Sequence, residues 1–238
     1  MGMVLLGVVP LGIVEGVEAH RLMPRFMVLP AVGVATACFG VVGLVGREVS
    51  GPVPEIDNLG FAAADRVFTA VPGVAEPLSY ATHPLALVGV IMLMAIVAYR
   101  VRRPRIALLA VLGPAAAVSF NAWVLKPVVG RELDGYLAYP SGHTTTLVSI
   151  LTVFTLVTAS NAPRGRRLRA TTGTAAISLV LAGTAVSAIV GLRYHYLTDT
   201  VGGFCWAVGA VITVAAVLDL LPGRHPALRL RHEQAYRA

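Results

Sequence analysis

Two histidines and one aspartate in the second half of the chain have types and a spacing suited to nucleophilic chemistry. His195 and Asp199 lie four residues apart in "GLRYHYLTDTVGG" (191–203), and His143 ends the stretch "YPSGH" (139–143). On a helix or its first turn, residues four apart share a face, so the carboxylate can meet one ring nitrogen of His195 and leave the other free. This arrangement holds a histidine as a nucleophile, and His143 can then protonate a leaving oxygen.

Cations and an expected helix N-terminus accompany these residues. Ser141 and Gly142 stand where a helix should begin, and a helix N-terminus with a glycine that lets a ligand approach closely is an anion site. Three cations lie close by in the sequence. Lys126 and Arg131 lie in "LKPVVGRELDG" (125–135), and Arg193 lies in the same stretch as His195. We therefore predict that the site binds phosphate.

Each feature taken alone has a simpler explanation. Pro140 and Ser141 could mark only a loop and the N-cap of a helix, because serine is a preferred cap. A lone histidine near a membrane surface is more often an anchor at headgroup level than a catalyst. The two histidines together, with a carboxylate at the fourth position and cations between them, favour the catalytic interpretation.

The surrounding sequence is strongly apolar. Of the 238 residues, 56% are hydrophobic and 13% are charged, whereas soluble domains have about 25% charged residues. We therefore predict an all-α, polytopic membrane protein with about six transmembrane helices in a single bundle. The apolar stretches of suitable length lie at about 27–46, 84–99, 106–125, 143–160, 171–192 and 201–221.

Arginine clusters fall on alternate sides of this six-span arrangement. Fourteen of the nineteen basic residues lie within 21–25, 100–105, 164–169 and 224–237, a pattern typical of cytoplasmic segments. Both termini are therefore expected in the cytoplasm. The three stretches 125–135, 139–143 and 191–203 are expected on the extracytoplasmic side of the cell membrane. Orientation and attraction to the anionic lipid bilayer account for the net charge of +7, so no nucleic-acid partner is expected.

The same pattern divides the chain into three parts. Residues 1–26 are expected to form an N-terminal interfacial segment, 27–221 the six-helix membrane domain and 222–238 a basic cytoplasmic tail. A seventh span at 1–17 is an open alternative. The long outer segment 47–83 is acidic and proline-punctuated, and we expect in it a short helix along the surface that serves as a lid or a packing element.

The sequence predicts neither a cofactor nor a metal. Cys38 and Cys205 lie in apolar stretches and are interpreted as small buried hydrophobes. The acids near the motifs, Glu132, Asp134 and Asp199, are too few to hold a metal ion, and no GxxxxGK[ST] loop supports nucleotide hydrolysis. A transporter would place ionisable groups near mid-membrane, whereas here they collect at one surface.

These motifs resemble those of the type 2 phosphatidic acid phosphatase superfamily, written KxxxxxxRP, PSGH and SRxxxxxHxxxD. Here PSGH is present as residues 140–143, and the HxxxD half of the third motif runs from His195 to Asp199. The order, spacing and bracketing spans match over about residues 80–221. Two parts depart from the pattern: the arginine and proline of the first motif would fall on Leu133 and Asp134, and the serine and arginine of the third on Ala188 and Ile189. Arg131 and Arg193 are the nearest substitutes, so the number of phosphate-binding cations is kept and their positions are shifted.

The resemblance implies an integral membrane phosphatase that acts on the extracytoplasmic side without a metal. His195 would attack phosphorus to give a phosphohistidine, with His143 as acid and then base and Asp199 orienting His195. Five residues would bind the phosphoryl oxygens: Lys126, Arg131, Ser141, Gly142 and Arg193. The expected substrate is a lipid phosphate or a polyprenyl (di)phosphate of the kind that serves cell-wall synthesis. A phosphotransferase that passes the phosphoryl group to an acceptor alcohol is the alternative, and the oligomeric state is left open.

Overall fold

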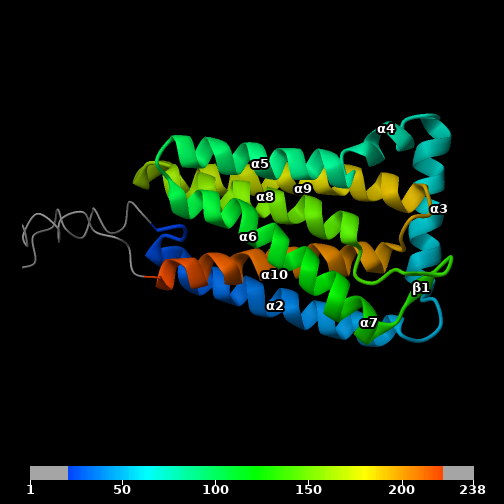
Figure 1. Ribbon diagram of the computed structural model, residues 1–238. Helices are drawn as coiled ribbons and strands as arrows, with labels where there is room; N and C mark the ends of the chain where they lie inside the picture. The colour runs from blue at the N-terminus through cyan, green and yellow to red at the C-terminus, as the bar shows by residue number, and fades with distance from the viewer. Residues whose placement is uncertain (1–20, 222–238) are drawn as a thin grey trace, which may run out of the picture.

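The computed structural model describes residues 21–221, which form a bundle of long helices with a shorter helix across one end (Figure 1). The principal helices are α2 (Arg25–Val49), α3 (Glu55–Ala70), α5 (Pro84–Arg100), α6 (Pro104–Phe120), α8 (Gly142–Asn161), α9 (Arg167–Gly191) and α10 (Leu197–Leu220). The short elements are α4 (Ala75–Tyr80), the π turn η1 (Asn121–Leu125), α7 (Lys126–Val129), β1 (Glu132–Leu133), β2 (Tyr136–Leu137) and the 3-10 turn η2 (Arg164–Arg166). The predicted tail 222–238 and most of the predicted segment 1–26 lie outside the described residues.

Six helices follow the order of the six predicted spans. Five helical stretches are long and apolar enough to cross a membrane: Arg25–Val49, Pro104–Val129, Gly142–Asn161, Arg164–Gly191 and Leu197–Leu220. α5 takes the place of the predicted span 84–99 but has only 17 residues, fewer than the roughly 20 that a full crossing needs. The prediction of an all-α, multi-pass membrane protein is confirmed. Within the described residues, the two-stranded hairpin of β1 and β2 is the exception.

α10 lies at the centre of the bundle and packs against α2, α6 and α8. Leu109, Val153 and Val211, from α6, α8 and α10, are fully buried in one apolar cluster. α2 approaches α10 closely, because a Cβ atom added at Gly209 would lie 2.6 Å from the ring of Phe39. This packing fixes the height of α10 relative to its neighbours, and therefore the position of the residues at its N-terminus.

The two described ends of the chain lie at the same end of the bundle (Figure 1). The backbone N–H groups of Leu22 and Met23 donate to the carboxylate of Asp219, at 2.9 and 2.8 Å. A carboxylate in the last turn of a helix opposes the helix dipole, and these two N–H donors offset that cost. The start of α2 and the end of α10 therefore lie at the same end of the bundle, as an even number of membrane crossings requires.

At the opposite end, α3 runs across the ends of the long helices (Figure 1). It lies in the segment 47–83, where the sequence predicts a helix along the surface, and it begins directly after Pro54. Phe61 and Ala64 on its inner face pack against Val190 of α9. Its first turn also carries a fully buried acid, Asp57, which a role as a simple lid does not require.

The arginine pattern predicts which end of the bundle faces the cell exterior. In a background with Cys38 and Cys205 replaced by alanine, we expect a membrane-impermeant maleimide to label Tyr136→Cys in intact cells. Tyr136 lies in the hairpin and is 79% exposed. Val101→Cys, at the arginine-rich end and 61% exposed, is the matched control and should react only after the cells are opened. The reverse labelling pattern would overturn the predicted orientation.

Candidate active site

The loop before α8 is held against the N-terminus of α10. Ser141 is the N-cap of α8: its side chain accepts from the N–H of Thr144, and its own N–H donates to the backbone oxygen of Asp199 at 2.9 Å. The contact is possible because residue 203 has no side chain. A Cβ atom added at Gly203 would lie 2.6 Å from the backbone oxygen of Ser141. The first turns of α8 and α10 are therefore fixed relative to each other by backbone contact.

Tyr139 anchors this loop to α2 and α10. Its ring is fully buried, and its hydroxyl donates to the backbone oxygen of Val42 at 2.7 Å. The ring packs directly on Gly202, where an added Cβ atom would lie 2.4 Å from it. Burial raises the pKa of the Tyr139 hydroxyl, so it remains a neutral donor and connects the loop to both α2 and α10.

His195 lies just before α10, whose N-cap is Tyr196. Asp199 is the third residue of the helix, and its Oδ2 accepts from the N–H of Tyr196 at 3.0 Å. Because the side chain of Asp199 turns back over the first turn, it faces His195: Nδ1 of His195 lies 3.6 Å from Oδ2 of Asp199. The four-residue spacing thus brings the two side chains together, as the sequence predicts.

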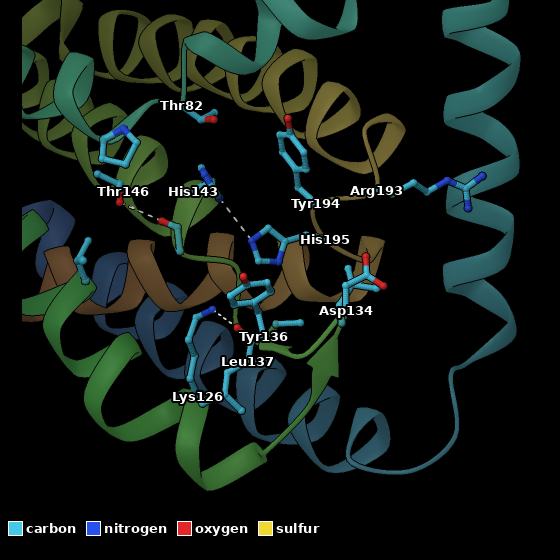
Figure 2. Close-up of a pocket in the computed structure, with 15 residues that line it drawn as sticks. Thr82, Lys126, Asp134, Tyr136, Leu137, His143, Thr146, Arg193, Tyr194 and His195 are labelled. Atoms are coloured by element: carbon cyan, nitrogen blue, oxygen red, sulfur yellow. Dashed lines mark hydrogen bonds between the residues drawn. The ribbon is translucent and has the colours of Figure 1, made fainter.

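The two histidines, from α8 and from the turn before α10, face each other (Figure 2). Nε2 of His195 lies 3.4 Å from Nδ1 of His143. Nδ1 of His195 is buried and has no hydrogen-bond partner among the described residues, since 3.6 Å to Asp199 exceeds hydrogen-bonding distance. Catalytic hydrogen bonds are often long before substrate binds and shorten in the complex. His195 therefore has one nitrogen toward a carboxylate and the other toward the second histidine.

Both histidines line a cavity of about 620 Å³ at the N-terminal ends of α8 and α10. Lys126 lines it too, and its ammonium group donates to the backbone oxygen of Leu137 (Figure 2). The π turn η1 sets the direction of this lysine, because a wider turn shifts the following residues around the helix axis. Asn121, the first residue of η1, donates to Thr145 of α8 at 2.8 Å and so fixes the turn against the helix that carries His143.

Gly142 brings the open N-terminus of α8 to the cavity. An added Cβ atom at Gly142 would meet nothing within 4 Å, and Gly142 and His143 both line the cavity. Among the described residues, no group accepts from the N–H of either residue, because the side chain of Ser141 is used by Thr144. Ser141 itself is fully buried and does not line the cavity, so the side chain serves as a cap and the backbone that follows it faces the ligand space.

Arg193 lies at the rim of the cavity but points away from the histidines, toward α3 (Figure 2). Its guanidinium pairs with Asp65 at 2.7 Å and lies 4.2 Å from the centre of the Phe61 ring. Both side chains of the pair are about half exposed, 51% and 52%. In this conformation Arg193 does not reach the space between the histidines and Lys126.

The structure places Arg131 differently from the expected phosphate ligand. Its guanidinium is buried and donates to Asp199 at 2.7 Å and to Asp57 at 2.6 Å. Arg131 does not line the cavity, because both terminal nitrogens of its guanidinium are paired with the carboxylates of Asp57 and Asp199. Asp57 is the functional candidate that sequence reasoning missed. Acids in the first turn of a helix are common, and no local signal shows that this one meets Arg131.

A scan against protein-family models matches residues 79–220 to the PAP2 superfamily. The match spans more than half of the chain and contains both histidines, Lys126 and Asp199. The chain belongs to the PAP2 superfamily. The resemblance inferred from the motifs is thereby confirmed, and membership of this superfamily supports the prediction that the protein is a membrane phosphatase.

A solved structure of a PAP2 protein has a similar fold. The crystal structure of the first transmembrane PAP2 type phosphatidylglycerolphosphate phosphatase from Bacillus subtilis superposes with a TM-score of 0.63 at 17% sequence identity. The alignment covers 80% of this chain and 98% of that one. A search of curated protein sequences finds no match. At this identity the likeness shows a shared membrane fold.

Proposed function

We propose that this PAP2 protein is an extracytoplasmic lipid phosphatase that works through a phosphohistidine intermediate on His195. The observation that carries the proposal is the orientation of His195, whose Nε2 faces His143 in the cavity and whose Nδ1 faces Asp199. A nucleophile, a proton donor and an orienting carboxylate thus meet beside a cation and an open helix N-terminus. This is the set that phosphoryl transfer through an enzyme nucleophile needs.

In the first step, the lone pair on Nε2 of His195 forms a bond to phosphorus as the bond to the leaving oxygen breaks. His143, in the same cavity, donates a proton to that oxygen, so a monophosphate substrate releases an alcohol and a diphosphate substrate releases a monophosphate. The imidazole becomes positively charged, and Asp199 stabilises it through Nδ1. In the second step, water gives a proton to His143 and attacks phosphorus, which releases inorganic phosphate and restores His195.

The phosphoryl oxygens would be held by Lys126 and by the N–H groups of Gly142 and His143. Preorganised donors aimed at developing negative charge are the largest contribution in this type of reaction. We further propose that Arg193 exchanges Asp65 for the phosphate when substrate enters. An exposed ion pair contributes only about 0–1 kcal/mol, so a dianion can displace the carboxylate.

The position of the cavity favours a lipid substrate. It lies at the ends of the spans, and Pro84 of α5 and Val118 of α6 contribute apolar walls next to the polar site. A phosphate carried at headgroup depth can reach this place while its chains stay in the bilayer. The Bacillus subtilis phosphatase with a similar fold is named for a lipid phosphate, which supports the same substrate class here.

An assay of the purified protein against a panel of lipid phosphates tests the proposed function. We expect release of inorganic phosphate from at least one lipid phosphate or polyprenyl (di)phosphate, with EDTA present, because amides and cations supply the charge stabilisation. Vanadate should inhibit, since its five-coordinate form mimics the transition state. A phosphorylated acceptor lipid in place of free phosphate would establish a phosphotransferase, and activity that requires added magnesium would contradict the mechanism.

Replacing each histidine separates their two roles. His195→Ala should abolish turnover and the acid-labile phosphoenzyme. His143→Ala should slow hydrolysis of alkyl phosphates by about 10²–10⁴-fold, the usual contribution of a general acid, and a nitrophenyl ester should recover part of the rate because its leaving group needs no proton. If the nitrophenyl ester lost as much rate as the alkyl phosphate, His143 would not be the leaving-group acid.

Replacing Arg193 tests whether this arginine at the rim of the cavity binds the phosphoryl group. Arg193→Ala should lower kcat/KM by about 10²-fold, in the range for one lost donor to the transition state. Asp65→Asn is the matched control: it breaks the same ion pair but leaves the guanidinium free, so activity should be retained. A fully active Arg193→Ala variant would reduce Arg193 to a surface anchor for α3.

A further inference from the structure

Asp57 joins α3 to the catalytic end of α10. Its side chain is fully buried, and Oδ1 accepts from the backbone N–H of Thr198 at 2.8 Å. Oδ2 accepts from the Thr198 hydroxyl at 2.9 Å and from Arg131 at 2.6 Å. Thr198 is the second residue of α10 and Asp199 is the third. An acid 141 residues away in the chain therefore caps the helix that presents the catalytic aspartate.

Arg131 connects the two carboxylates. One nitrogen of its guanidinium donates to Oδ1 of Asp199 and to the Thr198 hydroxyl, and the other donates to Asp57. The guanidinium also lies 4.0 Å from the centre of the Tyr196 ring. Because its side chain is only 5% exposed, this arginine is screened little by solvent and acts strongly on its neighbours. The cluster therefore holds Asp199 through Oδ1, the carboxylate oxygen that does not face His195.

The charges of this cluster have a consequence for His195. Arg131 alone would neutralise Asp199 and weaken its attraction to the positive ring that forms when His195 attacks phosphorus. Asp57 supplies a second negative charge that is fully buried and paired with the same arginine. The two carboxylates and the one guanidinium together carry a net charge of −1 beside His195. When the His195 ring becomes positively charged, the ring and these three groups together are neutral.

We infer that Asp57 is a positioning residue of the active site, which offsets Arg131 so that Asp199 can stabilise the charged His195. Arg131 in this assignment is a buried connector and not a phosphate ligand. The inference rests on the proposed phosphohistidine chemistry and deepens it. A purely structural role for Asp57, as an anchor that holds α3 on α10, is the competing explanation.

The two explanations differ in what a second substitution does. If Asp57 acts by charge, Asp57→Asn leaves Arg131 to neutralise Asp199, so no net negative charge remains beside His195. The further change Arg131→Gln removes the guanidinium and restores the net charge of −1. If Asp57 acts only as an anchor, the second substitution breaks more contacts and lowers activity further. Glu55→Gln is the matched control, because Glu55 lies in the same first turn of α3 but is exposed.

The experiment measures kcat, KM, the rate of phosphoenzyme formation and the melting temperature of these variants in nanodiscs, with a lipid phosphate that the wild-type protein hydrolyses. We expect Asp57→Asn to lower kcat and phosphoenzyme formation by about 10–100-fold, a range typical of groups that orient a functional residue by hydrogen bonding to it, with little change in KM. Glu55→Gln should match wild type. Asp57→Asn/Arg131→Gln should be several-fold more active than Asp57→Asn.

Several results would overturn the inference. They are an Asp57→Asn variant as active as Glu55→Gln, a loss confined to KM, and a double variant no more active than the single one. If Asp57→Asn does not fold, the double variant still decides, because a folded but inactive double variant contradicts the charge argument. Failure of the wild-type protein to hydrolyse any lipid phosphate would overturn the proposed function together with this inference, whereas the other results leave that function intact.

Discussion

The proposed active site depends on one backbone contact between two helix N-termini. Ser141 at the start of α8 donates its N–H to the backbone oxygen of Asp199 in the first turn of α10. This contact places His143, in the first turn of α8, beside His195, which lies directly before α10, with their ring nitrogens 3.4 Å apart. Because Gly202 and Gly203 carry no side chains, Tyr139 and Ser141 can lie directly on α10. Small residues and a capped turn therefore determine where the chemistry can occur.

Much of this arrangement can be predicted from the sequence, because it depends on local patterns. Apolar length gives the long helices, and the serine cap and the four-residue spacing of His195 and Asp199 give the first turns of α8 and α10. The hairpin of β1 and β2 is not among the predicted elements, although its turn also carries a local signal. Asp134 and Gly135 both have positive φ, at 51° and 80°, and an Asp-Gly pair is a strong signal for the tight turn that joins β1 to β2.

The buried charge cluster was not predictable, because it depends on partners far apart in the chain. Asp57 and Arg131 are separated by 74 residues, and each has an ordinary local explanation as a helix-start acid or a loop cation. Only the crossing of α3 over the end of α10 brings them together. The sequence therefore predicts a short surface helix within the segment 47–83 but does not assign the buried carboxylate of that helix to the site.

Arg131 and Arg193, the nearest substitutes for the arginines of the family motifs, differ in burial, a difference that the sequence does not show. Both pair with an aspartate of α3, at 2.6 and 2.7 Å. The pair of Arg193 and Asp65 is half exposed, so water can solvate either partner and the arginine is free to exchange one anion for another. The pair of Arg131 and Asp57 is buried, and Arg131 also pairs with Asp199, so removing the arginine alone would leave two buried carboxylates without their cation. Breaking a buried ion pair in this way costs about 3–5 kcal/mol. The half exposure of the Arg193 pair therefore supports the proposed exchange of Asp65 for phosphate, and the burial of the Arg131 pair supports its proposed role in holding Asp199.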